Sequence, residues 1–253
     1  MRRFFVPPEL SRGEVFELPE REARHATQVL RLEAGDALTV LDGAGGVMEC
    51  VVESTTKRSL RVTVRKREHR APLPCAITLV QAIPKGPAFE TIVQKATELG
   101  AARIIPLLSE RVVVQIGERD GAAKMEKWQQ IAIESIKQCG SPWLPRIEAP
   151  VSFGQWAERA PSADFAVVAS LESGSRHLHD VLAEFSAGKK NPAKSAIVWI
   201  GPEGDFTPAE YSAIDELGAA PITLGPLILR ADTAAIAALA VLNYELQRRN
   251  CLP

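Results

Sequence analysis

The chain has 253 residues, of which 46% are hydrophobic and 24% are charged, an ordinary balance for a soluble globular protein. Its 30 Lys and Arg residues against 31 Asp and Glu residues give a formal net charge of -1. This balance excludes a chain that is basic throughout, although it leaves room for a local basic surface. A chain of this length predicts one large domain or two unequal ones.

The N-terminal segment and the cysteines indicate a cytoplasmic protein. The apolar run that follows two arginines stops at Pro7, short of the roughly 7–15 residues that a secretory signal needs. No run of about 18 apolar residues predicts a membrane-spanning helix. The four cysteines, Cys50, Cys75, Cys139 and Cys251, form no C-x-x-C pair. We therefore expect reduced structural thiols.

Residues 1–72 have the pattern of a small β-rich domain. Apolar residues within 38–41 and 47–52 flank the turn Asp-Gly-Ala-Gly-Gly at 42–46. Because glycine adopts positive φ at little steric cost, this arrangement predicts a β-hairpin. Residues 59–65 alternate apolar and polar side chains, which predicts a third, half-buried strand.

A short helix and a basic strand complete this domain. Helical spacing of apolar residues between Glu22 and Leu32 predicts the helix. Basic residues gather on the third strand and its flanks: Lys57, Arg58, Arg61, Arg65, Lys66, Arg67 and Arg70. Arg61 and Arg65 share the parity of Thr63, which predicts that they lie on the polar face. Two interpretations stay open, a solvated strand edge that resists aggregation and a surface that follows RNA phosphates.

After a Pro-containing linker at 71–74, strands and helices alternate. Strands are predicted within 76–80, 103–108, 165–169 and 196–200, with a short one before Gly225. Helices are predicted within 89–99, 125–136, 207–217 and 233–246. This alternation predicts that residues 75–253 form an α/β domain with a mostly parallel sheet.

Several familiar catalytic and cofactor motifs are missing from the chain. It has no G-x-x-x-x-G-K-[ST], no G-x-G-x-x-G after a strand and no H-E-x-x-H. It also lacks the G-x-S-x-G nucleophile elbow. We therefore expect no phosphate-binding P-loop, no serine nucleophile and no metal.

A Gly-Pro-Glu-Gly turn at 201–204 follows the predicted strand that ends at residue 200. Thr207, Pro208 and Glu210 then have the spacing of an N-cap, an N1 proline and a capping-box partner. The carboxyl ends of strands are where α/β sheets bind ligands. An ordinary strand-to-helix turn is the alternative interpretation.

A second Gly-Pro turn at Gly225 and Pro226 leads into an Ala-rich helix. Asp232 or Thr233 is the predicted cap of that helix. Its first turns are so slim that either another helix or a flat ligand must pack closely against them. We expect the two Gly-Pro loops to form two walls of one pocket.

The order of several short motifs resembles a known family. They are His25–Leu32, close to "H-x-x-x-V-L-R", then Gln81–Lys85, Gln94–Gly100, Ser109–Arg111 and the two Gly-Pro loops. Together they resemble the ribosomal RNA small subunit methyltransferase E family, the 16S rRNA uracil-N3 methyltransferases of the SPOUT superfamily. The resemblance covers nearly the whole chain.

The resemblance implies a fold, a cofactor and partners. It implies a PUA-like RNA-binding β-barrel at 1–72 and, at 75–253, a SPOUT-type knotted parallel sheet with helices on both faces. It implies S-adenosylmethionine as cofactor, 16S rRNA of the small ribosomal subunit as partner, and a homodimer without membrane or metal.

The resemblance also implies site residues. The expected cofactor-binding residues are Gly201, Glu203, Gly204, Leu224, Gly225, Ile228, Leu229, Arg230 and Ala235. The expected catalytic residues are Arg230, Arg111 and Glu203. Glu98 is a second candidate base, and its alternative role is that of an exposed helix carboxylate. The expected RNA-binding residues are Arg31, Lys57, Arg58, Arg61, Arg65 and Lys85.

The chain departs from the family pattern at four positions. Leu227 replaces an arginine, Ala231 a threonine and Asp232 a glutamate, while Ser141 stands where the family generally has an arginine. Two missing arginines bear on the RNA-facing site, whereas cofactor contacts made by the backbone are unaffected.

The implied reaction is methylation of N3 of a specific uridine in 16S rRNA. Deprotonated uracil must be favoured by cationic or N–H donors, and a carboxylate is suited to take the proton. We expect Arg230 to hold one end of the pocket and Arg111 to contact RNA or the uracil anion. Two alternatives stay open, a SPOUT methyltransferase with another RNA target and a non-catalytic RNA-binding ribosome-assembly factor.

Overall fold

The structure is a computed structural model that describes residues 2–112, 118–188 and 192–247. Cys251, one of the predicted reduced thiols, lies outside these ranges. The chain divides into two compact units, residues 1–72 with 133–144 and residues 73–132 with 145–253. A stretch from the middle of the chain therefore belongs to the N-terminal unit.

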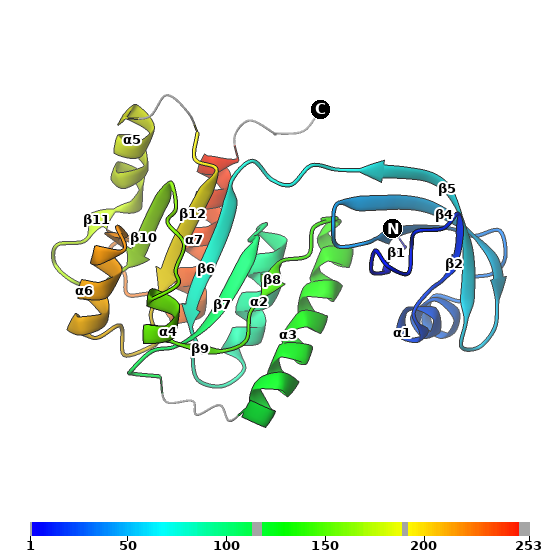
Figure 1. Ribbon diagram of the computed structural model, residues 1–253, viewed down its shortest axis with the longest axis horizontal. Coiled ribbons are helices and arrows are strands. Elements are labelled where there is room, and N and C mark those ends of the chain that lie inside the picture. The colour runs from blue at the N-terminus through cyan, green and yellow to red at the C-terminus, as the bar shows by residue number, and fades with distance from the viewer. Residues whose placement is uncertain (1, 113–117, 189–191, 248–253) are drawn as a thin grey trace. The chain divides into compact units, whose positions relative to one another are not determined.

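The first unit is built on a five-stranded sheet with the order β1-β3-β4-β5-β2 (Figure 1). The strands are β1 Arg3–Phe5, β2 Val15–Glu17, β3 Ala37–Leu41, β4 Gly46–Thr55 and β5 Leu60–His69. The predicted hairpin and third strand are confirmed as β3, β4 and β5, which pair in antiparallel fashion. β1 and β2 are too short to show a period, and the sequence did not predict them.

The helical part of this unit begins as α1, Glu20–Arg24, and continues as one π-helical turn, η1, His25–Val29. The N-terminal strand and this helix share a core with the sheet, in which Phe4, Ala23, Ala26 and Met48 are fully buried. Burial of these apolar groups, at roughly 25 cal/mol per Å², holds the helix against the sheet.

Residues 141–144 pack on the turn of the β3–β4 hairpin. The Gly45 amide donates to Pro142 O at 3.0 Å, and the Leu144 amide donates to Gly43 O at 3.0 Å. The Trp143 indole donates to Arg70 O at 3.0 Å. A Cβ at Gly45 would lie 2.7 Å from the Trp143 ring. The segment that departs from the family pattern is therefore a packing element of the first unit.

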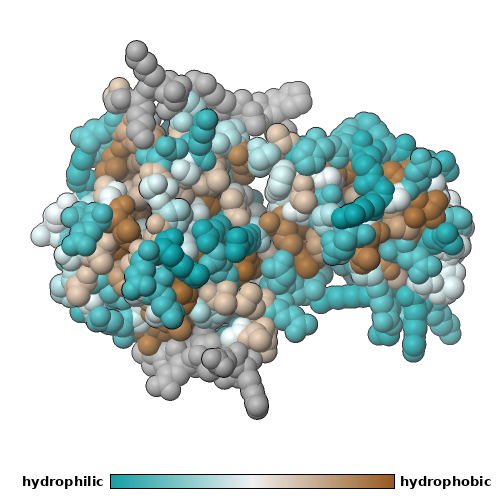
Figure 2. All heavy atoms as spheres, in the orientation of Figure 1, coloured by the Kyte–Doolittle hydropathy of each residue, from teal (hydrophilic) through white to brown (hydrophobic). Residues whose placement is uncertain are grey.

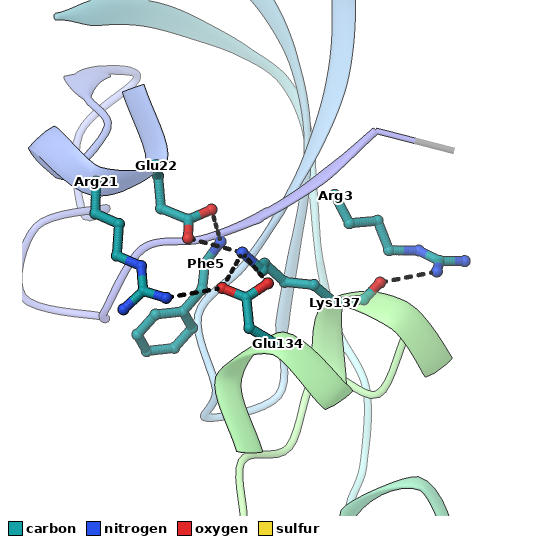
Figure 3. Close-up of polar contacts among 6 residues, drawn as sticks. All are labelled: Arg3, Phe5, Arg21, Glu22, Glu134 and Lys137. Carbon is teal, nitrogen blue, oxygen red and sulfur yellow. Dashed lines mark hydrogen bonds and ion pairs between the residues drawn. The ribbon is translucent and has the colours of Figure 1, made fainter. Parts of the chain in front are cut away.

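A buried ion pair joins α1 to the last turns of α3, Glu118–Cys139 (Figure 3). Glu22 is only 5% exposed. Its carboxylate accepts from Lys137 Nζ at 2.8 Å and from the Phe5 amide at 3.2 Å. The Arg3 guanidinium donates to the carbonyls of Lys137 and Gln138, which lack helical partners at the helix end.

The second unit is a parallel sheet with the order β11-β13-β10-β12-β6-β7-β8, with β9 also paired to β7. Its strands are β6 Ala76–Ala82, β7 Arg103–Leu108, β8 Arg146–Ile147, β9 Val151–Ser152, β10 Phe165–Ala169, β11 Arg176–His177, β12 Ser195–Ile200 and β13 Ala220–Thr223. The predicted mostly parallel α/β sheet is confirmed. The knot stays a prediction.

Helices cover both faces of this sheet (Figure 1). They are α2 Ala88–Glu98, α4 Phe153–Ala157, α5 Leu178–Gly188, α6 Pro208–Glu216 and α7 Ala231–Leu246, together with the start of α3. α7 packs on α2 and on strands β6 and β12, whereas α4 packs on α6 and β7. Trp156 of α4 and Ile214 of α6 close a core cluster over the central strands.

The helix starts agree with the sequence at α6 and differ at α7. Thr207 caps α6, and its capping box with Glu210 is complete. α7 begins at Ala231 with Arg230 as its N-cap, so the predicted caps Asp232 and Thr233 are wrong. The extended backbone of Arg230 starts the helix earlier, and Asp232 lies in its first turn, where a negative charge favours the helix dipole.

The described cysteines are free thiols, and two of the three are buried. Cys50 and Cys75 are buried free thiols and Cys139 is an exposed one. Burial raises the pKa of the Cys50 and Cys75 thiols to about 11, which keeps both protonated and unreactive. In the described ranges, no helix combines the length and apolar character that a membrane span needs.

Candidate functional site

A cavity of about 290 Å³ opens at the carboxyl ends of three neighbouring strands, β10, β12 and β13. Its walls are Ala169, Ser170, Leu171, Ile200, Gly201, Pro202, Glu203, Asp205, Ile222, Thr223, Leu224, Leu227, Ile228, Leu229, Arg230, Ala231 and Ala234. The two Gly-Pro loops line one pocket, as the sequence predicts. Residues 169–171 form a third wall, which the sequence analysis missed because that loop carries no motif.

Most of the residues expected to bind the cofactor line this cavity. They are Gly201, Glu203, Leu224, Ile228, Leu229 and Arg230. Gly204, Gly225 and Ala235 do not line it. Ala235 is fully buried one position after Ala234, so the slim helix α7 serves two purposes. Its alanines allow close packing on α2 and the sheet, and they also leave room for the cavity.

The cavity has an apolar rim. Leu171, Leu227 and Ile228 are 62%, 77% and 80% exposed. Large apolar side chains exposed together beside a cavity are typical of a surface that covers a ligand or a partner. The site thus combines apolar walls with a few polar groups, as small-molecule pockets do.

The loop at 201–207 is held from outside by Arg111 and Glu210. The Arg111 guanidinium donates to Gly204 O at 2.7 Å and to Phe206 O at 3.2 Å. Glu210 is 1% exposed, and its two carboxylate oxygens accept from the amides of Glu110 and Thr207, each at 2.9 Å. We call these two side chains, Arg111 and Glu210, the loop clamp.

Two of the expected catalytic residues lie on the cavity wall, and one lies behind it. Arg230 is exposed and lines the cavity. Glu203 is also exposed, and its Oε1 accepts from the Lys85 amide at 3.0 Å. Arg111 does not line the cavity, because its guanidinium is turned to the loop carbonyls. The contact of Arg111 with RNA or the uracil anion stays a prediction, and the geometry favours a positioning role.

Glu98 takes the alternative role that the sequence left open. Its carboxylate pairs with Lys95 Nζ at 2.8 Å on α2, and Glu98 is not among the residues that line the cavity. This geometry gives no support to Glu98 as the base.

Asp205 is a residue of the cavity that the sequence analysis did not single out. Its φ of +61° lies in the left-handed region, which residues other than glycine rarely adopt. Its Oδ1 accepts from the Phe206 amide at 2.9 Å and from the Tyr211 hydroxyl at 2.6 Å. The sequence did carry a signal for this residue. A charged side chain stands at position 205, between the Gly-Pro-Glu-Gly turn at 201–204 and the Thr207 cap of α6.

The residues expected to bind RNA divide between the two units. Arg31, Lys57, Arg58, Arg61 and Arg65 belong to the first unit and are exposed. Lys85 belongs to the second unit, where its amide holds Glu203. Figure 2 shows that hydrophilic residues predominate over the visible face of the first unit, with hydrophobic residues between them.

Two of the predicted RNA-binding segments, the turn at Lys57 and the helix end before Arg31, lie side by side in the first unit. Thr27 and Gln28 of η1 donate to the carbonyl of Lys57 at 3.4 and 3.2 Å, so the β4–β5 turn lies on the helix that ends before Arg31. Along β5 the register shifts at Arg65, where Val64 and Lys66 pair with consecutive residues of β4. This β-bulge interrupts the alternation, so the shared face of Arg61 and Arg65 stays a prediction.

Arg67 is exposed, but its guanidinium is engaged within the first unit. Its guanidinium donates to Ser11 O at 2.7 Å and to Gly13 O at 3.1 Å. It therefore fixes the loop before β2, and only part of the basic run is available to a partner.

No metal site is evident in residues 2–112, 118–188 and 192–247, where no group of three His, Cys, Asp or Glu side chains is arranged to hold an ion.

A parallel α/β sheet with a ligand-sized cavity at its strand ends is the architecture of a domain that binds a small molecule. Residues 71–243 match the family described as an RNA methyltransferase domain, and residues 18–65 match an RNA methyltransferase PUA domain. Ribosomal RNA small subunit methyltransferase E from Synechocystis is 34% identical over 245 residues, which span 97% of this chain and 78% of that protein.

Two solved structures are similar over almost the full length. A methyltransferase from Legionella pneumophila in complex with the bound cofactor SAM has a TM-score of 0.85 and 32% identity, with 96% of both chains covered. A ribosomal RNA small subunit methyltransferase E from Neisseria gonorrhoeae bound to S-adenosyl methionine has a TM-score of 0.84 and 28% identity, with 96% and 97% covered. The chain therefore belongs to the ribosomal RNA small subunit methyltransferase E family of RNA methyltransferases.

Proposed function

We propose that this chain transfers a methyl group from S-adenosylmethionine to N3 of a specific uridine in 16S rRNA of the small ribosomal subunit. The observation that carries the proposal is the cavity at the ends of β10, β12 and β13, lined by both Gly-Pro loops. Relatives that share the whole fold are solved with that cofactor bound. The site residues named below and the choice of N3 as the methylated atom are parts of the same proposal.

The residues of the cavity fit this cofactor. Ile222, Leu224, Leu229 and the alanines of α7 form apolar walls suited to a flat purine, while the backbone of the two loops offers N–H and C=O groups. Arg230 is a cation suited to the carboxylate of the methionine part. We place Gly204, Gly225 and Ala235 in the supporting backbone, because they do not line the cavity.

When bound, the cofactor supplies a methyl group on a positively charged sulfonium, so the reaction needs no metal to activate the donor. The new bond forms at N3 of uracil while the bond from sulfur to methyl breaks, and the N3 proton must leave. Glu203 is our candidate to accept that proton. Arg230 holds either the cofactor end or the substrate end of the pocket, and at the substrate end its guanidinium would stabilise the negative charge on the uracil oxygens.

The target uridine must be unpaired or turned out of its stack, because N3 takes part in Watson–Crick pairing. We assign capture of the surrounding RNA to the exposed basic residues of the first unit and to Lys85. We also infer a cytoplasmic homodimer. The exposed side chains of Val241 and Tyr244 on α7 offer an apolar surface of the kind that a second copy buries.

The reaction is tested by calorimetry and by nucleoside mass spectrometry. The purified chain is expected to bind S-adenosylmethionine and to restore 3-methyluridine in small-subunit rRNA from a strain that lacks the gene. Binding without any methylated nucleoside would favour the non-catalytic assembly factor. Methylation of another base or position would favour a methyltransferase with a different RNA target.

The role of the basic residues is tested by their effect on salt dependence. The double change Arg58→Ala and Arg61→Ala is expected to weaken RNA binding, because each lost phosphate contact lowers the slope of log affinity against log salt by about 0.7–0.9. The measurement is a filter-binding titration at several salt concentrations, with cofactor affinity unchanged.

Lys194→Ala is the matched control, since it removes an exposed cation outside the predicted set. If the double variant keeps the wild-type slope of log RNA affinity against log salt, Arg58 and Arg61 do not contact RNA phosphates. The interpretation of a solvated strand edge would then hold for them.

A further inference from the structure

Asp205 occupies a backbone conformation that needs compensation. A non-glycine residue at a φ of +61° carries a steric cost, and such residues are often found at functional sites. The Asp205 amide donates to Pro202 O at 2.9 Å, which closes a tight turn inside the cavity wall. The carboxylate therefore stands at a fixed place on this wall.

Tyr211 of α6 orients this carboxylate. Its hydroxyl donates to Asp205 Oδ1 at 2.6 Å. Burial, and then the bond to Asp205, hold the pKa of Tyr211 well above its usual range. The phenol therefore stays protonated and keeps donating at every physiological pH.

Gly201 leaves the space that this arrangement needs. A Cβ at position 201 would lie 3.0 Å from Asp205 Oδ1 and 3.3 Å from the Phe206 amide nitrogen. The first glycine of the Gly-Pro-Glu-Gly turn thus makes room for the carboxylate that follows four residues later.

Both contacts to Asp205 use one oxygen. Oδ1 accepts from the Phe206 amide and from the Tyr211 hydroxyl. Oδ2 accepts no hydrogen bond from any residue in the described part of the chain, and Asp205 lines the cavity. Asp205 as a whole is half-buried, so this second carboxylate oxygen is left available to accept a hydrogen bond from a ligand in the cavity.

We propose that Asp205 is a ligand-binding residue, whose Oδ2 accepts a hydrogen bond or charge contact from the cofactor in this cavity, and that Tyr211 is its positioning residue. The inference rests on the proposed function, because it takes S-adenosylmethionine as the ligand. That molecule offers three such groups to a carboxylate, namely the ribose hydroxyls, the α-ammonium group and the sulfonium centre.

The test compares three ligands by calorimetry with the full chain. S-adenosylmethionine carries all three groups, S-adenosylhomocysteine lacks the sulfonium charge, and 5′-methylthioadenosine lacks both the charge and the amino acid. Asp205→Asn is the sharp variant, because asparagine tolerates left-handed backbone and its carbonyl oxygen still accepts from Phe206 and Tyr211. In this variant an NH₂ group replaces Oδ2 alone.

We expect Asp205→Asn to lower the affinity about tenfold or more for every ligand that carries the contacted group, as loss of a charged hydrogen bond predicts. A loss with all three ligands assigns the ribose, a loss with the first two assigns the ammonium group, and a loss with S-adenosylmethionine alone assigns the sulfonium. Tyr211→Phe keeps the carboxylate and should give a smaller loss of the same ligand pattern.

Asp205→Gly provides a second variant if asparagine impairs folding, because glycine takes this φ without strain. Affinities that equal those of the wild type for all three ligands would overturn the inference and leave the proposed function standing. A wild-type chain that binds none of the three would overturn the proposed function itself, and the inference with it.

Discussion

Glu210→Ala is expected to reduce kcat/KM for S-adenosylmethionine about 100-fold and to lower the free energy of unfolding by about 3 kcal/mol. The change removes a buried acceptor from the amides of Glu110 and Thr207, and each lost bond to a charged group costs about 1.5–3 kcal/mol. A cavity wall displaced by about 1 Å is enough for a 100-fold loss. Steady-state kinetics and denaturant unfolding give the two values.

Glu216→Ala is the matched control, because Glu216 is exposed on the same helix. It is expected to leave activity and stability unchanged. If Glu210→Ala behaves like Glu216→Ala, the loop clamp does not hold the loop at 201–207.

The other half of the clamp separates two roles for Arg111. If Arg111 positions the loop through the carbonyls of Gly204 and Phe206, Arg111→Ala weakens cofactor binding even when RNA is absent. If Arg111 contacts only RNA or uracil, cofactor affinity without RNA stays at the wild-type value. Calorimetry with cofactor alone therefore distinguishes the positioning role that the geometry favours from the RNA or uracil contact that the sequence predicts.

Lys137→Met is expected to lower the free energy of unfolding by about 3–5 kcal/mol, the usual effect of removing one partner of a buried ion pair. The side chains of Lys137 and Glu22 are 10% and 6% exposed, so the carboxylate of Glu22 loses its counter-charge where water cannot replace it. Chemical denaturation measures the loss. The double change Glu22→Gln and Lys137→Met should recover most of it, since no buried charge remains.

Arg21→Ala offers a control within the same group of contacts (Figure 3). Arg21 lies 3.7 Å from Glu134, and both side chains are more than half exposed. Loss of such a surface pair costs at most about 1 kcal/mol. If Arg21→Ala and Lys137→Met lower the free energy of unfolding equally, burial does not determine how much the Glu22–Lys137 pair contributes to stability.

The elements that the sequence determined are those with a repeating local pattern. β6, β7, β10 and β12 have nearly continuous apolar runs, and the capping box at Thr207 and Glu210 is complete within four residues. These signals are local because side-chain alternation and helix capping depend only on near neighbours. The motif order along the chain also led to the family, since motifs survive changes between them.

The tertiary structure decided everything that joins distant residues. Glu22 and Lys137 are 115 residues apart, and Arg111 reaches Gly204 across 93 residues. Such partners share no local sequence pattern, because the packing of helices and loops from distant parts of the chain brings them together. The placement of β10 beside β12 and β13 added the third wall of the cavity.

The turn at 201–207 shows the division most clearly. Its glycines and proline, and the helix cap that follows, predict a ligand loop from sequence alone. The positive φ of Asp205 and its bond to Tyr211 depend on α6 folding back over the turn. The sequence by itself determined that a ligand loop stands here. Only the tertiary structure decided the conformation of Asp205 at the cavity wall, because packing, and not local propensity, overcomes the strain at that residue.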